Sequence, residues 1–251
     1  MLDQLFVYHP MPWSEQDWPR LSRLPLEDVW FQAADGTRIF GWYVQVSAEA
    51  PVLLWCHGNA GNITHRLGNL ARLFQLGLSV FLFDYRGYGR SHGQPSEAGL
   101  YQDALAAHAY LTTVRRIGPQ RLVVFGRSLG SAVAGHVVSQ RLVAGLILES
   151  SFPSVAHMAR THYFGLPAHW LLRARFDLVS SLKDVKIPLL VIHGDRDRIV
   201  PIQLGQVVYE GARTPKKAFY LVSGAGHNDV TIVGGRQYFK RIKDFIALVS
   251  R

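Results

Sequence analysis

The sequence predicts an α/β fold: one domain, residues 1–251, built on a mostly parallel, eight-stranded sheet with helices on both faces. Two observations lead to this prediction. From residue 51 onward, short continuous apolar runs alternate with stretches of helical composition, a pattern typical of parallel strands that are buried on both faces. In addition, the 251 residues are 48% apolar and contain no repeat, low-complexity tract or flexible linker, so one large core is expected.

The sheet is expected to begin with a hairpin. The apolar stretches 29–31 and 39–44 flank Asp35-Gly36, which is a strong turn signal. Six further strands are predicted at residues 52–56, 78–83, 121–125, 145–148, 188–192 and 218–222. Helices are predicted at residues 63–76, 97–114, 129–140, 203–212 and 231–249. Crossover helices between parallel strands cover both faces of a sheet.

Two segments lie outside this alternation. Residues 1–25 are rich in proline and aromatic side chains, and we expect an irregular arm packed on the domain, with contact to a membrane surface as the weaker alternative. Residues 152–186 form the one long excursion between strands, too short for a separate cap domain, so a lid-like insertion of a few small helices is expected over a pocket. The aromatic side chains predicted to line that pocket are Phe152, Tyr163, Phe164 and Trp170.

Composition narrows the classes of function. The formal net charge is +9, but the basic residues are scattered as pairs, which favours a surface of one dominant sign. Attraction to anionic lipid or to an acidic substrate is the alternative. Nucleic-acid binding is not expected, because no recognised motif or basic stripe accompanies the charge.

The expected location is the cytoplasm. No apolar stretch is long enough to span a bilayer, and the N-terminus lacks the basic start and apolar segment of a secretory signal. Peripheral association with a membrane is the alternative. The chain has one cysteine, Cys56, so no internal disulfide can form, and its place in an apolar strand indicates core packing.

The most informative segment is residues 126–130, with the pattern Gly-x-Ser-x-Gly around Ser128. It follows a predicted strand and precedes a predicted helix of small residues, as a nucleophile elbow must. Such a turn is too tight for side chains two residues before and after the serine. It also aims the N-terminus of the helix, with its free N–H groups, at the reacting centre.

Other polar residues follow strands that are predicted to end at the same edge of the sheet. Residues 57–62 follow the third strand, the pair Asp195 and Asp197 follows the seventh, and His227 follows the eighth. The known folds that carry a catalytic triad differ in the chain order of its members, and the order Ser, Asp, His is typical of a single one of them.

The chemistry of acyl transfer assigns a role to each group. A serine hydroxyl is a weak nucleophile, so His227 must accept the proton of Ser128 and later return it to the leaving group. A carboxylate, assigned to Asp197, holds the imidazole in the correct tautomer. The oxyanion of the intermediate needs two backbone N–H donors, and we expect these from Asn59 and Leu129.

Five segments together resemble the α/β-hydrolase-fold serine hydrolases, and more narrowly a small, cap-poor subgroup that includes bud-emergence-type proteins and animal protein depalmitoylases. The similar segments are residues 57–62, 84–91, 126–130, 193–197 and 226–227. The resemblance runs from about residue 27 to the end of the chain. It implies hydrolysis of carboxylic esters through an acyl-enzyme intermediate, with an acyl ester as substrate and no cofactor. Thioester cleavage, for example removal of acyl chains from proteins, is the alternative.

Several assignments have alternatives. Asp195 competes with Asp197 as the acid, but the second aspartate matches the family pattern, and the first would then hold the loop. Glu149, at the end of a predicted strand, is a further candidate acid, whereas His57 is expected to be structural. No metal site is expected, because the remaining histidines lack the spacing of ligands. A catalytically silent binding protein on the same fold is the alternative from another class.

Overall fold

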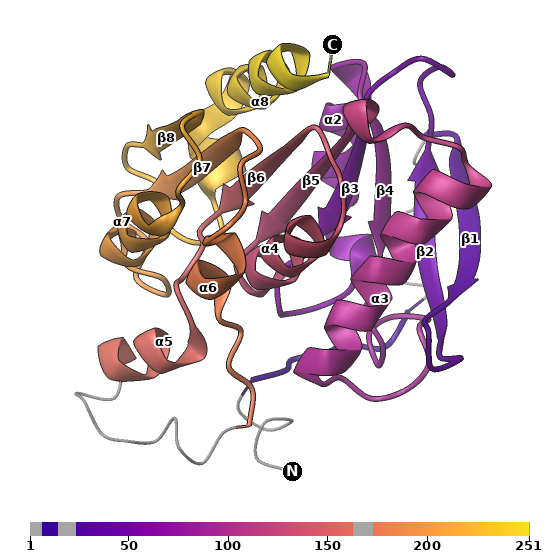
Figure 1. Cartoon of the computed structure of the whole chain (residues 1–251), viewed down its shortest axis with the longest axis horizontal. Coiled ribbons are helices and arrows are strands. Elements are labelled where there is room, and N and C mark those ends of the chain that lie inside the picture. Colours follow the sequence, from indigo (N-terminus) through magenta and orange to yellow (C-terminus); the bar gives the residue numbers. More distant parts are fainter. Residues whose placement is uncertain (1–6, 15–23, 163–172, 251) are drawn as a thin grey trace.

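The structure is a computed structural model that describes residues 7–14, 24–162 and 173–250. Its centre is a single sheet of eight strands in the order β1-β2-β4-β3-β5-β6-β7-β8 (Figure 1). The strands are β1 (Leu26–Gln32), β2 (Arg38–Val44), β3 (Val52–Cys56), β4 (Ser79–Phe83), β5 (Leu122–Arg127), β6 (Gly145–Glu149), β7 (Leu189–Gly194) and β8 (Lys217–Val222). The predicted α/β fold with an eight-stranded, mostly parallel sheet is confirmed.

The first two strands account for the antiparallel part of the sheet. β1 and β2 form the predicted hairpin, and β2 also pairs antiparallel with β4, whereas all pairings among β3 to β8 are parallel. The turn of the hairpin contains Gly36 with a φ of 82°, a left-handed conformation that glycine adopts without strain.

Helices cover both faces of the sheet (Figure 1). Alternation along the strands divides the core into two layers: Leu54 and Cys56 of β3 face one layer, and Leu53 and Trp55 face the other. The first layer is covered by α3 (Glu97–Ala109), α4 (Leu129–Gln140), α6 (Leu178–Leu182) and α7 (Ile202–Gly211). The second is covered by α2 (Leu67–Gln75) and α8 (Val230–Val249).

Two predicted helices are less regular than their composition indicates. The helix expected at 97–114 ends as α3 at residue 109 and continues as a π-helical turn, Tyr110–Val114. The helix expected at 231–249 is interrupted near its start by Gly235, whose φ of 48° and ψ of −133° are not helical. Both departures depend on local backbone geometry that apolar spacing does not encode.

The described part of the N-terminal arm lies on the loops that follow β3 and β4. Isolated bridges join Pro10 to Gly61 and Pro12 to Gly89. The backbone N–H of Gly61 donates to the carbonyl of His9 at 3.2 Å. This segment therefore packs against the loops at the carboxyl ends of β3 and β4, although it forms no helix or strand of its own.

Among the described residues of the predicted insertion 152–186, two short helices are present: α5 (Val155–His162) and α6. In Figure 1, α5 and the described arm segment lie at the same end of the sheet, at the bottom of the view. Among the described residues, no helix is both long and apolar enough to cross a membrane.

Candidate active site

Ser128 occupies a sharp turn between β5 and α4. Its φ of 52° and ψ of −120° place a non-glycine residue in a sparsely populated region of backbone space, which stores strain at this position. The flanking glycines permit the turn. A Cβ added to Gly126 would lie 2.4 Å from the carbonyl oxygen of Gly130, and one added to Gly130 would lie 2.1 Å from that of Cys56. Only residues without side chains fit both positions.

His227 connects Ser128 to a carboxylate. The loop after β8 places its Nε2 3.1 Å from Ser128 Oγ, and its Nδ1 lies 2.7 Å from Oδ2 of Asp197, in the loop after β7. An ionised carboxylate only accepts hydrogen bonds, so Nδ1 carries the ring proton and Nε2 is left to accept from the serine hydroxyl. The structure thus brings together the three side chains of the predicted triad.

Asp197 is held by several donors. Its Oδ1 accepts hydrogen bonds from the backbone N–H groups of Ile199, at 2.9 Å, and Val200, at 2.7 Å. Burial raises the pKa of Asp197, but the hydrogen bond and the charge of His227, together with the N–H of Val200, lower it by a larger amount. The pKa therefore lies below its usual value. The side chain is therefore a carboxylate at neutral pH and can orient and stabilise an imidazolium.

The two alternative acids have other partners. Asp195 Oδ1 accepts from the backbone N–H of Gly224 at 2.6 Å, and its Oδ2 accepts from the Ser223 hydroxyl at 3.1 Å. It thus ties the loop after β7 to the loop that carries His227. Glu149 is buried at the end of β6 and accepts hydrogen bonds from Arg127 and Tyr238.

Arg127 and Glu149 form a brace that sequence reasoning missed. Arg127 Nε donates to Glu149 Oε1 at 2.8 Å, and its Nη2 donates to the backbone carbonyl of His227 at 2.7 Å and to Asn228 Oδ1 at 3.0 Å. The Tyr238 hydroxyl donates to the other oxygen of Glu149. The sequence held one signal: Arg127 and Glu149 are charged residues just past the ends of the predicted strands 121–125 and 145–148. The structure pairs them in the register of β5 and β6.

The two predicted oxyanion donors lie on either side of the nucleophile strand. Leu129 is the first residue of α4, and Asn59 lies in the loop after β3. Within the described parts of the chain, neither backbone N–H donates a hydrogen bond to another residue. These groups are therefore available to a substrate oxygen.

The arm fixes the side chain of Asn59. Its Nδ2 donates to the carbonyl of Val7 at 2.5 Å, while its Oδ1 accepts from the Tyr88 hydroxyl at 2.8 Å and the backbone N–H of His9 at 3.2 Å. The candidate oxyanion loop is thus held by a segment of the chain about fifty residues away.

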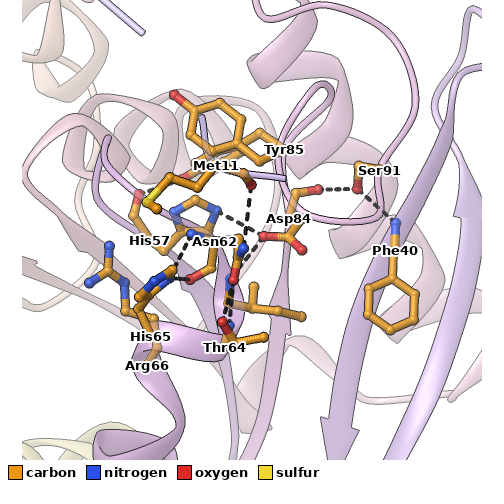
Figure 2. Close-up of polar contacts among 12 residues, drawn as sticks. Met11, Phe40, His57, Asn62, Thr64, His65, Arg66, Asp84, Tyr85 and Ser91 are labelled. Carbon is orange, nitrogen blue, oxygen red and sulfur yellow. Dashed lines mark hydrogen bonds and ion pairs between the residues drawn. The ribbon is translucent and has the colours of Figure 1, made fainter. Parts of the chain in front are cut away.

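A buried polar network supports the same loop, and Figure 2 shows its contacts. The Tyr85 hydroxyl donates to the carbonyl of His57 at 2.9 Å, and the imidazole Nδ1 of His57 contacts the Gly58 carbonyl at 2.7 Å. Burial, and next the charge of Arg66, lower the pKa of His57 to about 3. The ring is therefore neutral, and its position inside the loop's own hydrogen bonds is that of a structural residue.

Asp84 lies beneath this loop, with no exposed surface. Its Oδ1 accepts from the backbone N–H of Ile63 at 2.9 Å, which fixes the start of the 3₁₀ turn Ile63–Arg66 (Figure 2). Burial raises the pKa of Asp84 to about 7, although the N–H groups of Ile63 and Arg90 lower it in part. This carboxyl therefore titrates in a range where solvent-exposed aspartates are already ionised.

The candidate triad opens into a cavity of about 600 Å³. Phe152 lines it, as do Val155, Met158 and Ala159 at the start of the insertion. The other residues predicted to line the pocket, Tyr163, Phe164 and Trp170, lie outside the described residues. No cluster of three or more potential metal ligands occurs in the described part of the chain.

Comparison with known proteins identifies the family. A family model described as the alpha/beta hydrolase fold matches residues 51–177. The chain belongs to the alpha/beta hydrolase fold family. It is 41% identical over 221 residues to an uncharacterized protein, Rv2307c, of Mycobacterium tuberculosis, covering 87% of this chain and 78% of that protein. It is also 36% identical over 219 residues to the protein bem46 of Schizosaccharomyces pombe, covering 82% and 71%. The predicted relation to bud-emergence-type proteins is confirmed.

Solved structures agree on the fold of this hydrolase-family chain. The esterase Pf2001 of Pyrococcus furiosus superposes with a TM-score of 0.80, at 22% sequence identity, over 98% of this chain and all of that one. At such identity the match concerns the fold alone.

Proposed function

We propose that this protein is a serine hydrolase that cleaves carboxylic esters through an acyl-enzyme intermediate. One observation carries the proposal: in an accessible cavity, Ser128 Oγ lies 3.1 Å from His227 Nε2, and His227 Nδ1 lies 2.7 Å from a buried Asp197 carboxylate. A nucleophile, a base and an orienting acid in this arrangement are what acyl transfer requires.

In the proposed reaction, Ser128 Oγ attacks the ester carbonyl carbon while its proton passes to Nε2 of His227. The resulting imidazolium is stabilised by Asp197, and the oxyanion by the backbone N–H groups of Asn59 and Leu129. Collapse of the intermediate expels the alcohol, which takes the proton from His227. Water, deprotonated by the same imidazole, then attacks the acyl-serine, and the acid is released as the serine hydroxyl re-forms.

Two further observations support this proposal. The family to which the chain belongs is built on the hydrolase fold, and a structural neighbour is named as an esterase, although the likeness to it concerns the fold only. The cavity wall formed by Phe152, Val155 and Met158 is apolar, which suits a hydrocarbon acyl chain.

Hydrolysis of p-nitrophenyl esters of increasing acyl length, with matched thioesters, tests the proposal. Ser128→Ala should abolish turnover, because the nucleophile is lost, and should leave the fold intact. The control is Ser139→Ala, which removes an exposed hydroxyl from the last turns of the same helix and should keep full activity. Turnover by Ser128→Ala equal to that of the wild type would refute the assignment, and faster thioester than ester cleavage would change the substrate class.

A further inference from the structure

The lining of the cavity at Ser128 differs on the two sides of β5: the β3 side combines polar residues with Val7 and Met11 of the arm, whereas the residues after β6 and β7 are apolar. Strand β3 flanks β5 on one side, while β6 and β7 lie on the other. Lining residues that follow β6 and β7 are apolar: Phe152, Val155, Met158, Ala159, Ile199 and Val200. The lining on the β3 side includes His65 and Arg66, which belong to the 3₁₀ turn after that strand.

The two arginines that line this cavity differ in how their charge is balanced. Arg127 is paired with the buried Glu149 carboxylate at 2.8 Å. Arg66, in contrast, has no carboxylate within ion-pair distance among the described residues. Its Nη2 donates a hydrogen bond to the backbone carbonyl of Ala60 at 2.6 Å, and its Nε is buried with no hydrogen-bond partner among the residues that the structure describes. The cation in the wall of the cavity is thus offset only at longer range, by the charges of Glu149 and Asp84, and has no carboxylate paired with it directly.

The electrostatic setting makes an anion favourable beside Arg66. Burial, and next the charge of Arg127, lower the pKa of Arg66 to about 10. The guanidinium is still cationic at neutral pH, but it is less well solvated than a surface arginine. An anionic ligand would relieve both the lost hydration and the repulsion from the second arginine.

His65 adds a second polar side chain next to Arg66. Its Nδ1 accepts the backbone N–H of Asn62 at 3.2 Å, which completes the capping box of the turn (Figure 2). The same nitrogen lies 3.3 Å from the Asn62 carbonyl oxygen, so the ring is held against the turn in either tautomer. His65 is exposed and lines the cavity, so its imidazole borders the space that a ligand would occupy.

We propose that Arg66 and His65 form a subsite for an anionic group, a carboxylate or a phosphate, carried by the ester substrate, while the acyl chain occupies the apolar side beyond β5. This subsite rests on the proposed esterase function and narrows the substrate class to acidic acyl esters. Planar guanidinium groups bind such oxyanions through two parallel N–H donors, which a lysine does not provide. The net charge of +9 favours the approach of the same class of substrate.

The first measurement uses inorganic phosphate as the probe, at constant ionic strength so that general screening does not change. Phosphate should inhibit hydrolysis of p-nitrophenyl butyrate competitively and should raise the melting temperature of the wild type. Arg66→Gln removes the charge but keeps a donor for the Ala60 carbonyl, and it should weaken the inhibition about tenfold, as expected for a lost charge-assisted hydrogen bond. Arg66→Lys should retain part of the effect.

The second measurement compares butyryl esters of 4-hydroxybenzoate and of 4-hydroxyphenyl phosphate with the neutral ester of 4-hydroxybenzamide. The ratio of kcat/KM for each acidic ester to that for the neutral one should fall about tenfold in Arg66→Gln. Because the esters differ in leaving-group reactivity by the same factor in every variant, comparing this ratio between the wild type and Arg66→Gln cancels that difference. The larger drop identifies whether a carboxylate or a phosphate is preferred.

The matched control is Arg72→Gln, which removes an equal charge from an exposed position on α2 outside the cavity lining. It should keep wild-type phosphate inhibition and wild-type ratios. Equal effects of the two substitutions would show that the net charge of the protein, and not a local subsite, attracts the anion, and would overturn the proposal. A wild type that phosphate neither inhibits nor stabilises would overturn it as well. Failure of the wild type to cleave any of the esters, neutral ones included, would instead refute the proposed function.

Discussion

Arg127 is the residue whose replacement tests the organisation of the site most sharply. It connects the buried Glu149 carboxylate, which is 1% exposed, to the backbone carbonyl of His227. Arg127→Met keeps an unbranched apolar stem of similar shape and removes every donor of the guanidinium. We expect lower stability together with lower activity, because the same side chain compensates a buried charge and holds the loop of the general base.

The magnitude follows from burial. The Glu149 side chain is 2% exposed and that of Arg127 14%, so the pair is largely withdrawn from water. Removing one partner of a buried ion pair costs about 3–5 kcal/mol, and we expect the lower value, about 3 kcal/mol, because the Tyr238 hydroxyl still donates to the carboxylate. For a chain of this size, that corresponds to a melting temperature lower by roughly 6–12 °C.

The Arg127→Met protein should also be less active than the wild type when both are fully folded. Without the donors to the His227 carbonyl and Asn228, the imidazole is less well positioned, and a displacement of about 1 Å costs on the order of a hundredfold in rate. We therefore expect kcat/KM for p-nitrophenyl butyrate to drop about tenfold to a hundredfold at temperatures where the variant is fully folded. KM should change less than kcat.

Urea unfolding and ester hydrolysis measure the two effects. The double variant Arg127→Met/Glu149→Gln should be more stable than the sum of the single losses predicts, by at least about 1 kcal/mol, because no buried charge is left unpaired. Arg236→Met, at an exposed position of α8, serves as the control. Unfolding free energies and kcat/KM of Arg127→Met that match those of the control would show that the brace does not act as described.

Three further predictions concern the turn, the network under the candidate oxyanion loop and the acid. Gly130→Ala should destabilise the fold by about 1–3 kcal/mol or more and reduce activity, because the new Cβ would lie 2.1 Å from the Cys56 carbonyl oxygen. Asp84→Asn should gain stability relative to the wild type as the pH rises: the carboxyl titrates near 7 when folded but near 3.8 when unfolded, so ionisation costs the wild type stability across that window. Asp197→Asn should lower kcat by a factor on the order of 10³–10⁴ through loss of the correct imidazole tautomer, whereas Asp195→Asn should lower it far less.

Thermal and urea unfolding check the first two of these variants. A Gly130→Ala protein as stable as the wild type would mean that the turn can relax. For Asp84→Asn, the difference in unfolding free energy from the wild type is measured at pH 5 and pH 8, and an identical difference at both would contradict the raised pKa. Comparable kcat losses in the two aspartate variants would favour a shared role over the assignment of Asp197.

The strands were predictable because their signal is local. Runs such as 52–56 and 145–148 are continuous and apolar, as burial on both faces requires, and they correspond to β3 and β6 within one residue. The turn at Ser128 was equally predictable from the sequence, because Gly126 and Gly130 have no space for a Cβ and so must be glycine. Composition gave no warning of the break at Gly235, which depends on the backbone of one residue.

Contacts between distant segments were not predictable in the same way. The bond from Asn59 to the carbonyl of Val7 and the pairing of Arg127 with Glu149 depend on register and on how the arm crosses the loops. Glu149 illustrates the limit: its position after a strand made it a candidate acid, while its partners in space make it a brace. A charged residue that ends a buried strand indicates a partner, but only the sheet order identifies that partner.

Covalent labelling with a fluorophosphonate tests the catalytic assignment most directly, since the reagent reacts with a serine only when a base has activated it. Mass spectrometry of the digested protein should locate the adduct on Ser128, and His227→Ala should lose the label although the serine is still present. A wild-type protein that is folded but remains unlabelled, or that carries the adduct on another residue, would contradict the serine-hydrolase mechanism.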